Sequence, residues 1–289
     1  MNNLVLRAIT GTLFVGVLVG CILYGPISFT VLFAIITGLA LWEFGTNVNQ
    51  YAGAAINKLI NTTGGVYLFL AFFYYCSGYV KGNSDALVFV PFLITLLFLP
   101  ISELYLKHED PLKSWAYAFA SQLYVALPFA LLNVLAFHYD PMTNHYEYNW
   151  VLPLAIFIFL WTSDTGAYCV GSLLHKKFPA KLFERISPNK SWIGSIGGGI
   201  FCLLAGYLLW FFTKENMPMS LPAWLGLGLV VCIFGTWGDL VESLFKRQLG
   251  IKDSGNVLPG HGGMLDRFDS SLLAIPAAVL YLYTIPFFG

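Results

Sequence analysis

The chain has 289 residues, of which 57% are hydrophobic and only 10% are charged, and its 15 basic residues balance its 15 acidic ones. Soluble domains carry about 25% charged residues, so this composition excludes a protein whose surface mainly faces water. We expect an integral membrane protein in a lipid bilayer, and the balanced charge gives no reason to expect a nucleic-acid partner.

About nine segments are apolar and long enough to cross the hydrocarbon core as helices, which takes about 20 residues each. They lie near residues 4–24, 28–46, 64–80, 86–106, 115–137, 151–174, 192–213, 221–245 and 270–288. Glu43 interrupts the second segment and Asp164 the sixth. The pattern predicts an all-α fold, a polytopic transmembrane helical bundle.

Basic residues are distributed unevenly over the loops between these segments. With a cytoplasmic N-terminus, all of the 15 basic residues except Lys81 and Lys214 fall on the inner side. Cytoplasmic loops normally carry the excess of Lys and Arg. We therefore expect a multi-pass protein of a bacterial-type inner (plasma) membrane, with its N-terminus and its polar loops in the cytoplasm.

The two halves of the chain differ in their polar content. Residues 1–150 are apolar spans with sparse loops, which we expect to face lipid and to serve packing or oligomerisation. Residues 151–289 hold nearly all polar motifs, so we expect a polar cavity on the cytoplasmic side there. The five cysteines lie in apolar stretches without a C-x-x-C pair, which favours buried apolar roles over metal binding.

The sixth segment carries a stripe of polar and small residues. Asp164, Tyr168, Gly171 and His175 fall on one face of a helix with about 3.6 residues per turn. Ionisable groups at membrane depth are costly and usually mark a functional site. The alternative for Asp164 is a structural hydrogen bond between helices, and for His175 an ordinary interfacial position.

A short polar segment, Ser187-Pro-Asn-Lys-Ser191, comes directly before the helix that begins near Trp192. Backbone and side-chain donors at a helix N-terminus form an anion site. The alternative is that these residues cap the helix and add positive charge to the inner side.

The eighth segment ends in a second polar stripe. Asp239, Glu242, Ser243 and Lys246 share one narrow helix face. An internal pair of Glu242 with Lys246 would steady the helix end. That alternative leaves Asp239 unexplained, and we predict that it binds a metal ion.

A glycine-rich block at residues 243–269 follows this stripe. Gly260, Gly262 and Gly263 allow backbone N–H groups to approach an anion. The basic residues of the block can neutralise phosphate charge, and its carboxylates are hard ligands of the kind that Mg²⁺ prefers. The block favours phosphoryl or nucleotidyl transfer over the alternative, a solvated connecting loop.

The block from Ser243 to Asp269 resembles the signature of phosphatidate cytidylyltransferases, also called CDP-diacylglycerol synthases. It follows the pattern S-x-x-K-R-x4-K-D-x4-[LIF]-P-x-H-G-G-x-x-D-R-x-D at every fixed place. The segments 164–168, 187–192 and 238–239 are also similar to motifs of this family. Asn189 and Ile193 depart from the lysine and glutamate that members often carry.

The resemblance implies that the phosphate of phosphatidic acid attacks the α-phosphorus of CTP and that pyrophosphate leaves. It implies Mg²⁺ as a cofactor, with a second cation in the site. The predicted metal ligands are Asp239 and Asp266, followed by Asp269 and Asp164. The predicted catalytic residues are Asp239, Lys246, Lys252, His261, Asp266 and Asp269. The predicted substrate-binding residues are Tyr168, Ser187, Lys190, Ser191, Ser243, Arg247, Gly262, Gly263 and Arg267.

Two other functions remain open from the sequence. A CTP-dependent lipid kinase would use similar residues but would transfer the γ-phosphate. An ion-coupled transporter would account for Asp164 and Asp239 at membrane depth, although the two halves show no inverted pairing. The oligomeric state is open as well, with a homodimer as one alternative.

Overall fold

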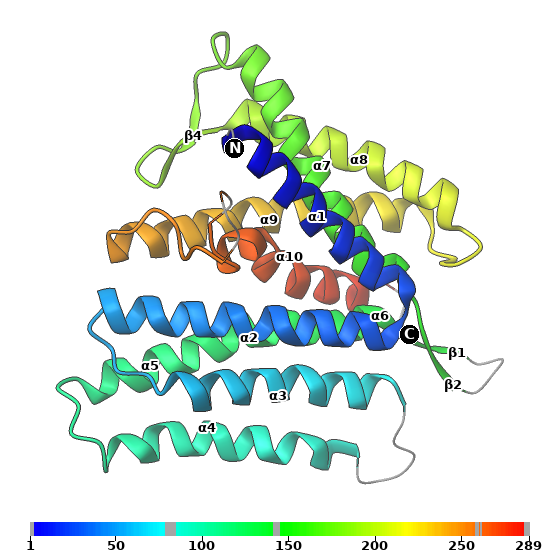
Figure 1. Cartoon of the computed structure of the whole chain (residues 1–289). Coiled ribbons are helices and arrows are strands. Elements are labelled where there is room, and N and C mark those ends of the chain that lie inside the picture. Colours follow the sequence, from blue (N-terminus) through cyan, green and yellow to red (C-terminus); the bar gives the residue numbers. More distant parts are fainter. Residues whose placement is uncertain (1–2, 79–84, 141–144, 258–259, 261, 286–289) are drawn as a thin grey trace. The chain divides into compact units, whose positions relative to one another are not determined.

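A computed structural model describes residues 3–78, 85–140, 145–257, 260 and 262–285, and these residues are mainly helical (Figure 1). The α-helices are α1 (Asn3–Tyr24), α2 (Pro26–Tyr51), α3 (Lys58–Cys76), α4 (Val90–Glu103), α5 (Pro111–Ser121), α6 (Leu127–Ala136), α7 (Val151–Leu174), α8 (Trp192–Thr213), α9 (Leu221–Leu249) and α10 (Leu265–Thr284). Two short helices of other types are η1 (Asp85–Phe89) and η2 (Gln122–Ala126). The strands are β1 (Phe137–Asp140), β2 (His145–Tyr148), β3 (Lys181–Phe183) and β4 (Ser187–Ser191).

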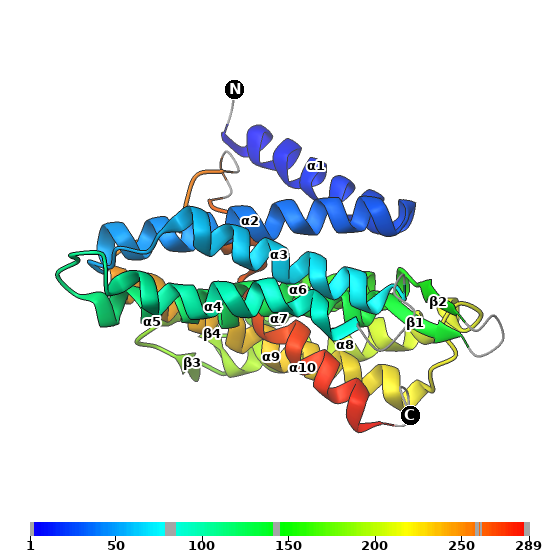
Figure 2. The ribbon, with the colours of Figure 1, turned by 90° about the horizontal axis from the view of Figure 1, so that it is seen from below.

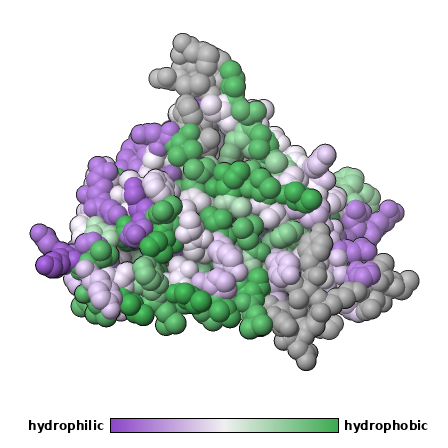
Figure 3. Space-filling view, turned by 60° about the horizontal axis from the view of Figure 1, so that its bottom comes forward, coloured by the Kyte–Doolittle hydropathy of each residue, from purple (hydrophilic) through white to green (hydrophobic). Residues whose placement is uncertain are grey.

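The prediction of an all-α polytopic membrane protein is confirmed. Within the described residues, eight helical segments are long and apolar enough to cross a membrane. They match the first eight predicted spans, with ends that shift by a few residues. The ninth, α10, is absent from this set of eight because Asp266, Arg267 and Asp269 make its first turns polar. Figure 3 shows hydrophobic side chains over much of one face, as expected for contact with lipid.

The chain folds into two compact units. The first unit contains residues 1–150 and 248–268, and the second contains 151–247 and 269–289. The glycine-rich block therefore divides between them: most of it belongs to the same unit as helices α1–α6, although it follows α9 in the sequence.

In the first unit, α2, α3 and α4 run side by side, and α6 packs against α3 (Figures 1 and 2). Aromatic rings fill the core: the ring of Phe268 lies 5.4 Å from that of Phe129 and 6.5 Å from that of Phe33. Burial of such rings is a large favourable contribution. Through Phe268, the first turn of α10 is anchored in the core of this unit.

A hairpin that the sequence did not predict lies between α6 and α7. Strands β1 and β2 pair antiparallel, with Phe137 opposite Tyr148. The hydroxyl of Tyr148 donates a hydrogen bond of 2.7 Å to the carbonyl of Ile22 at the end of α1. Burial raises the pKa of this hydroxyl.

In the second unit, α7 and α8 approach each other closely along a glycine seam, defined as Gly166, Gly194, Gly197 and Gly198. A Cβ atom added at Gly198 would lie 2.9 Å from the carbonyl of Ser163, and one at Gly194 would lie 3.1 Å from the carbonyl of Ala167. Small residues permit such backbone contact between membrane helices. The seam therefore fixes α8, and the residues directly before it, against α7.

The segment between α7 and α8 forms a second hairpin. Strand β3 pairs antiparallel with β4, which places Lys181 opposite Ser191 and Phe183 opposite Ser187. The sequence indicated a polar segment directly before the helix and no strand here. It ends at Ser191, whose Oγ accepts a hydrogen bond of 3.2 Å from the N–H of Gly194 and caps α8.

Candidate active site

The polar stripe of α9 meets the β3–β4 hairpin at Asp239. The Nζ of Lys190 lies 2.5 Å from Oδ2 of Asp239, and the hydroxyl of Ser243 donates a 3.1 Å hydrogen bond to Oδ1. Lys190 was predicted as a phosphate ligand and Asp239 as a metal ligand, but their contact was not predicted. The carboxylate is thus held by a basic residue from another element and by a hydroxyl one turn away.

The pair Glu242–Lys246, left open by the sequence, is present. Nζ of Lys246 lies 2.6 Å from Oε2 of Glu242, and the side chain of Glu242 is fully buried. A buried carboxylate without a charged partner would be costly. Glu242 therefore holds the Lys246 ammonium one turn from Ser243, on the same side of α9 as Asp239.

Asp269 of α10 belongs to the same group of charges. Its carboxylate interacts electrostatically with Asp239, Lys246 and Asp164. A glycine permits this approach, because a Cβ atom at Gly238 would lie 2.7 Å from the carbonyl of Asp269. We refer to Asp164, Lys190, Asp239, Ser243, Lys246 and Asp269 as the α9 cluster. It unites residues from α7, β4, α9 and α10.

The α9 cluster contains charges of both signs. Three carboxylates that lie within electrostatic range repel one another, and Lys190 and Lys246 offset this repulsion. Among the residues that the structure describes, no three His, Cys, Asp or Glu side chains are close enough to form a metal site by themselves. Within the described residues, a cation at the α9 cluster would thus have at most two of these side chains as ligands.

The glycine-rich block folds around Asp266 in the first unit. Oδ2 of Asp266 accepts two hydrogen bonds of 2.8 Å, from the backbone N–H groups of Ser254 and Gly263. Gly262 has a φ of 81°, which favours glycine, and a Cβ atom there would lie 2.6 Å from Oδ2 of Asp266. Asp266 thus closes the block into a compact turn at the start of α10.

Glu43 of α2 also contacts this turn, although the sequence pattern indicated no role for it. Its Oε2 accepts a 2.8 Å hydrogen bond from the N–H of Met264, and its Oε1 accepts one from the hydroxyl of Ser254. The partners lie 211 and 221 residues away in the sequence. The only signal that could have identified Glu43 is its position as an acidic residue inside an apolar span.

The remaining predicted site residues occupy more open positions. Tyr168, Arg247, Lys252 and Arg267 are exposed, and Ser187 is partly exposed at the start of β4. Ser191, predicted to bind substrate, is buried as the cap of α8. His261 lies outside the described residues. Asp239 and Asp266 fall in different units, so their predicted meeting stays a prediction.

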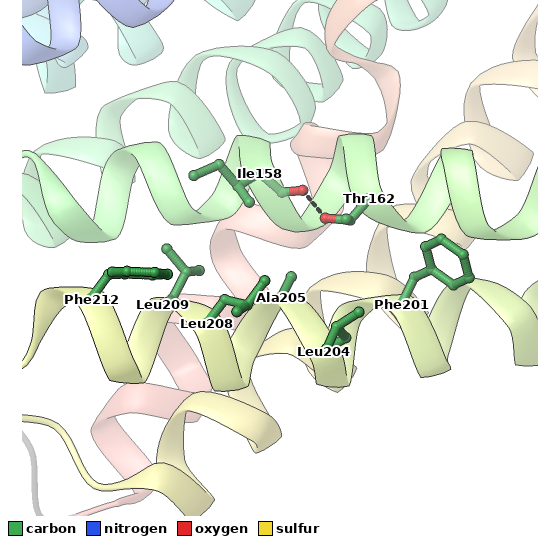
Figure 4. A pocket seen from close by; sticks show the side chains of 8 residues that line it. All are labelled: Ile158, Thr162, Phe201, Leu204, Ala205, Leu208, Leu209 and Phe212. Carbon is green, nitrogen blue, oxygen red and sulfur yellow. Dashed lines mark hydrogen bonds between the residues drawn. The ribbon is translucent and has the colours of Figure 1, made fainter.

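A groove of about 230 Å³ lies between α7 and α8 in the second unit (Figure 4). Its walls are apolar apart from Thr162, whose hydroxyl already donates to the carbonyl of Ile158. The groove offers no group that would bind a phosphate. The groove therefore takes no part in the charged chemistry of this unit.

Comparison with known proteins matches residues 5–285 to the cytidylyltransferase family. A phosphatidate cytidylyltransferase of Staphylococcus aureus (strain COL) is 33% identical over 272 residues, which cover 93% of this chain and 95% of that protein. One from Haemophilus influenzae is 32% identical over 290 residues, with 96% of each chain covered. One from Staphylococcus haemolyticus is 48% identical over 123 residues, or 43% of this chain and 45% of that protein.

Proposed function

Because this chain belongs to the cytidylyltransferase family, it is a nucleotidyltransferase, and we propose that it makes CDP-diacylglycerol from CTP and phosphatidic acid. A phosphate oxygen of the lipid attacks the α-phosphorus of CTP. The bond from this phosphorus to the bridging oxygen breaks, and pyrophosphate leaves with the electron pair. The lipid phosphate is already anionic at neutral pH, so the reaction needs no strong general base.

The observation that carries this proposal is the α9 cluster in a protein of membrane helices. Two phosphate-bearing reactants repel each other, and catalysis of such a transfer consists mainly of positioning and charge stabilisation. Lys190 and Lys246 are each held by a carboxylate at 2.5 and 2.6 Å. We propose that they contact the triphosphate and the lipid phosphate, with Ser243 beside them.

The residues of the cluster suit Mg²⁺. This ion usually takes one or two carboxylates from the protein and completes its shell with water and substrate phosphates. Asp239 and Asp269, which interact electrostatically, would supply these carboxylates. When bound, the ion would neutralise phosphate charge and polarise the phosphorus centre. Asp266 and Asp164 remain proposed as further ligands.

The exposed basic residues of the glycine-rich block would complete substrate binding. We propose that Arg247, Lys252 and Arg267 contact phosphate groups from the aqueous side. The strong excess of Lys and Arg in the loops on this side supports a cytoplasmic site. In that position, acyl chains stay in the bilayer while CTP arrives from water.

The products of the reaction test this function. Purified protein in phosphatidic acid vesicles would be supplied with CTP labelled in the α-phosphate, with and without Mg²⁺. We expect labelled CDP-diacylglycerol and one pyrophosphate per lipid, and no product after chelation of Mg²⁺. Labelled CDP, released together with a lipid that carries the unlabelled γ-phosphate, would identify a kinase. Unchanged CTP, with neither pyrophosphate nor CDP released, would exclude both enzymes in favour of a transporter.

A further inference from the structure

A carboxylate of the first unit accepts its hydrogen bonds from a hydroxyl and a backbone N–H group. The side chain of Glu43 is 7% exposed, although α2 is apolar enough to cross a membrane. Its two oxygens accept hydrogen bonds from Ser254 Oγ and Met264 N. Burying a charged group costs free energy unless it is hydrogen-bonded. We therefore infer that the glutamate at this position holds the segment that supplies these donors, residues 254–264.

The donors include the N-terminus of α10. Met264 directly precedes α10, and the N–H of Leu265 is also directed at Glu43. The first N–H groups of a helix have no partner within the helix, and its N-terminus carries a partial positive charge. Glu43 therefore caps α10 from a different helix and fixes where α10 begins.

A second residue of α2 holds the same loop. Asn47 lies one turn after Glu43, and its Nδ2 donates a 2.8 Å hydrogen bond to the carbonyl of Ser254. Ser254 is itself buried, with 3% exposure. The side chain and the carbonyl of Ser254 are thus held by two successive turns of one helix.

The contact reaches Asp266 through Ser254. The hydroxyl of Ser254 donates to Glu43 and accepts a 3.2 Å hydrogen bond from the N–H of Asp266, while the N–H of Ser254 donates to Oδ2 of Asp266. Glu43, Ser254 and Asp266 form a continuous chain of hydrogen bonds. A change at Glu43 would alter both the backbone and the side chain of Asp266.

Two glycines of the block lie so close to the Glu43 carboxylate that a larger residue would not fit. A Cβ atom at Gly255 would lie 2.7 Å from the Glu43 carboxylate carbon, and one at Gly263 would overlap the carboxylate oxygens. The sequence interpretation explained Gly263 by approach to a phosphate. In the structure, the close neighbour that requires glycine at this position is Glu43.

We propose that Glu43 is a positioning residue for cytidylyl transfer, which orients Asp266 through Ser254 and the N-terminus of α10. This role rests on the proposed function of the protein. Glu43 takes no part in bond making. It ensures that the Asp266 carboxylate has one orientation when substrate binds, because a misplacement of about 1 Å can cost on the order of 100-fold in rate.

The test uses full-length protein in nanodiscs and the variant Glu43→Gln. The amide has nearly the same shape but turns an NH₂ group toward one of the two donors. The matched control is Thr37→Val in the same helix, since Thr37 is fully buried and its hydroxyl donates locally, to the carbonyl of Phe33. Hydrogen–deuterium exchange is measured along the chain, and kcat and KM for CTP are measured in parallel.

For Glu43→Gln we expect faster exchange confined to residues 252–266, with kcat lower by about 10- to 100-fold and a smaller change in KM. Thr37→Val should leave the exchange of residues 252–266 and kcat unchanged. The double variant Glu43→Gln/Ser254→Ala should lose less kcat than the product of the two single-variant losses predicts. The reason is that both residues belong to one chain of hydrogen bonds, so their effects are not independent.

Three results would overturn the role of Glu43: an unchanged kcat, unchanged exchange in this loop, or faster exchange throughout the first unit, which would indicate general destabilisation. Exchange does not depend on the reaction. An inactive wild-type protein would therefore count against the proposed function, whereas the loop data would still decide whether Glu43 holds the turn.

Discussion

Lys190 and Asp239 form an ion pair of 2.5 Å between strand β4 and helix α9. Their side chains are 26% and 30% exposed, and pairs open to solvent typically contribute only about 0–1 kcal/mol to stability. The contact therefore matters more for chemistry than for folding. It brings a basic residue from the β3–β4 hairpin to the carboxylates of the α9 cluster.

Replacing this lysine tests the cluster directly. Lys190→Ala should lower kcat/KM by about 100-fold, a typical cost of removing one charge-stabilising donor, because phosphate charge then faces Asp239 without compensation. Lys190→Arg should retain part of the activity. The control is Lys181→Ala, an exposed lysine of the same hairpin. Equal activity of the Lys190→Ala and Lys181→Ala proteins would remove Lys190 from the site.

The two predicted principal metal ligands can be neutralised one at a time. Asp239→Asn and Asp266→Asn should each lower turnover by about 100-fold or more while insertion stays normal, because each removes a charge that would hold Mg²⁺. The apparent Mg²⁺ requirement should rise in any residual activity. Glu215→Gln, at an exposed position before α9, serves as the control. Near-normal turnover of both Asp→Asn variants would reject the metal assignment.

The close approach of α9 to α10 predicts a steric effect at Gly238. A Cβ atom there would lie 2.7 and 2.9 Å from the carbonyls of Asp269 and Ser270. Gly238→Ala should therefore lower stability by about 1–3 kcal/mol and reduce kcat by separating Asp239 from Asp269. Gly199→Ala is the control, since its Cβ would have no neighbour closer than 3.9 Å. Thermal unfolding and kcat are measured on the same samples of both variants. Equal stability and equal kcat of Gly238→Ala and Gly199→Ala would contradict the close contact.

Lys252 provides a test of substrate binding in the first unit. It is exposed in the glycine-rich block, so Lys252→Ala should raise KM for CTP or lipid by about 10-fold with a smaller effect on kcat, as expected when binding is weakened. Lys107→Ala, exposed after α4, is the matched control. If KM for both substrates stays at the wild-type value, Lys252 does not bind them.

Local sequence patterns predicted most of the helices, because a membrane span needs a long apolar run that is visible in the sequence. Features that depend on the hydrogen-bonding pattern of the backbone were harder to predict from the sequence. The predicted helix 115–137 is a succession of α5, the π-helical η2 and α6. Neither hairpin was predicted, since strands of three to five residues leave little periodicity to detect.

Within the candidate site, helix periodicity correctly placed neighbours along α9. The contacts of Asp239 with Ser243 and of Glu242 with Lys246 both span four residues. Helix periodicity cannot predict contacts between segments that are far apart in the sequence. The partnership of Lys190 with Asp239 depends on the packing of the hairpin, and Glu43 was interpreted only as an interruption of an apolar span because its partners are more than 200 residues away.

The glycine seam between α7 and α8 has a consequence for engineering this enzyme. Lys190 precedes α8 by a single residue, Ser191, so the seam that positions α8 also governs where Lys190 stands relative to Asp164 on α7. Replacing helical glycines with alanine is a common route to a more heat-resistant protein. At these four positions the added methyl group would meet other atoms at 3.1 Å or less, so a thermostabilised variant has to retain these glycines.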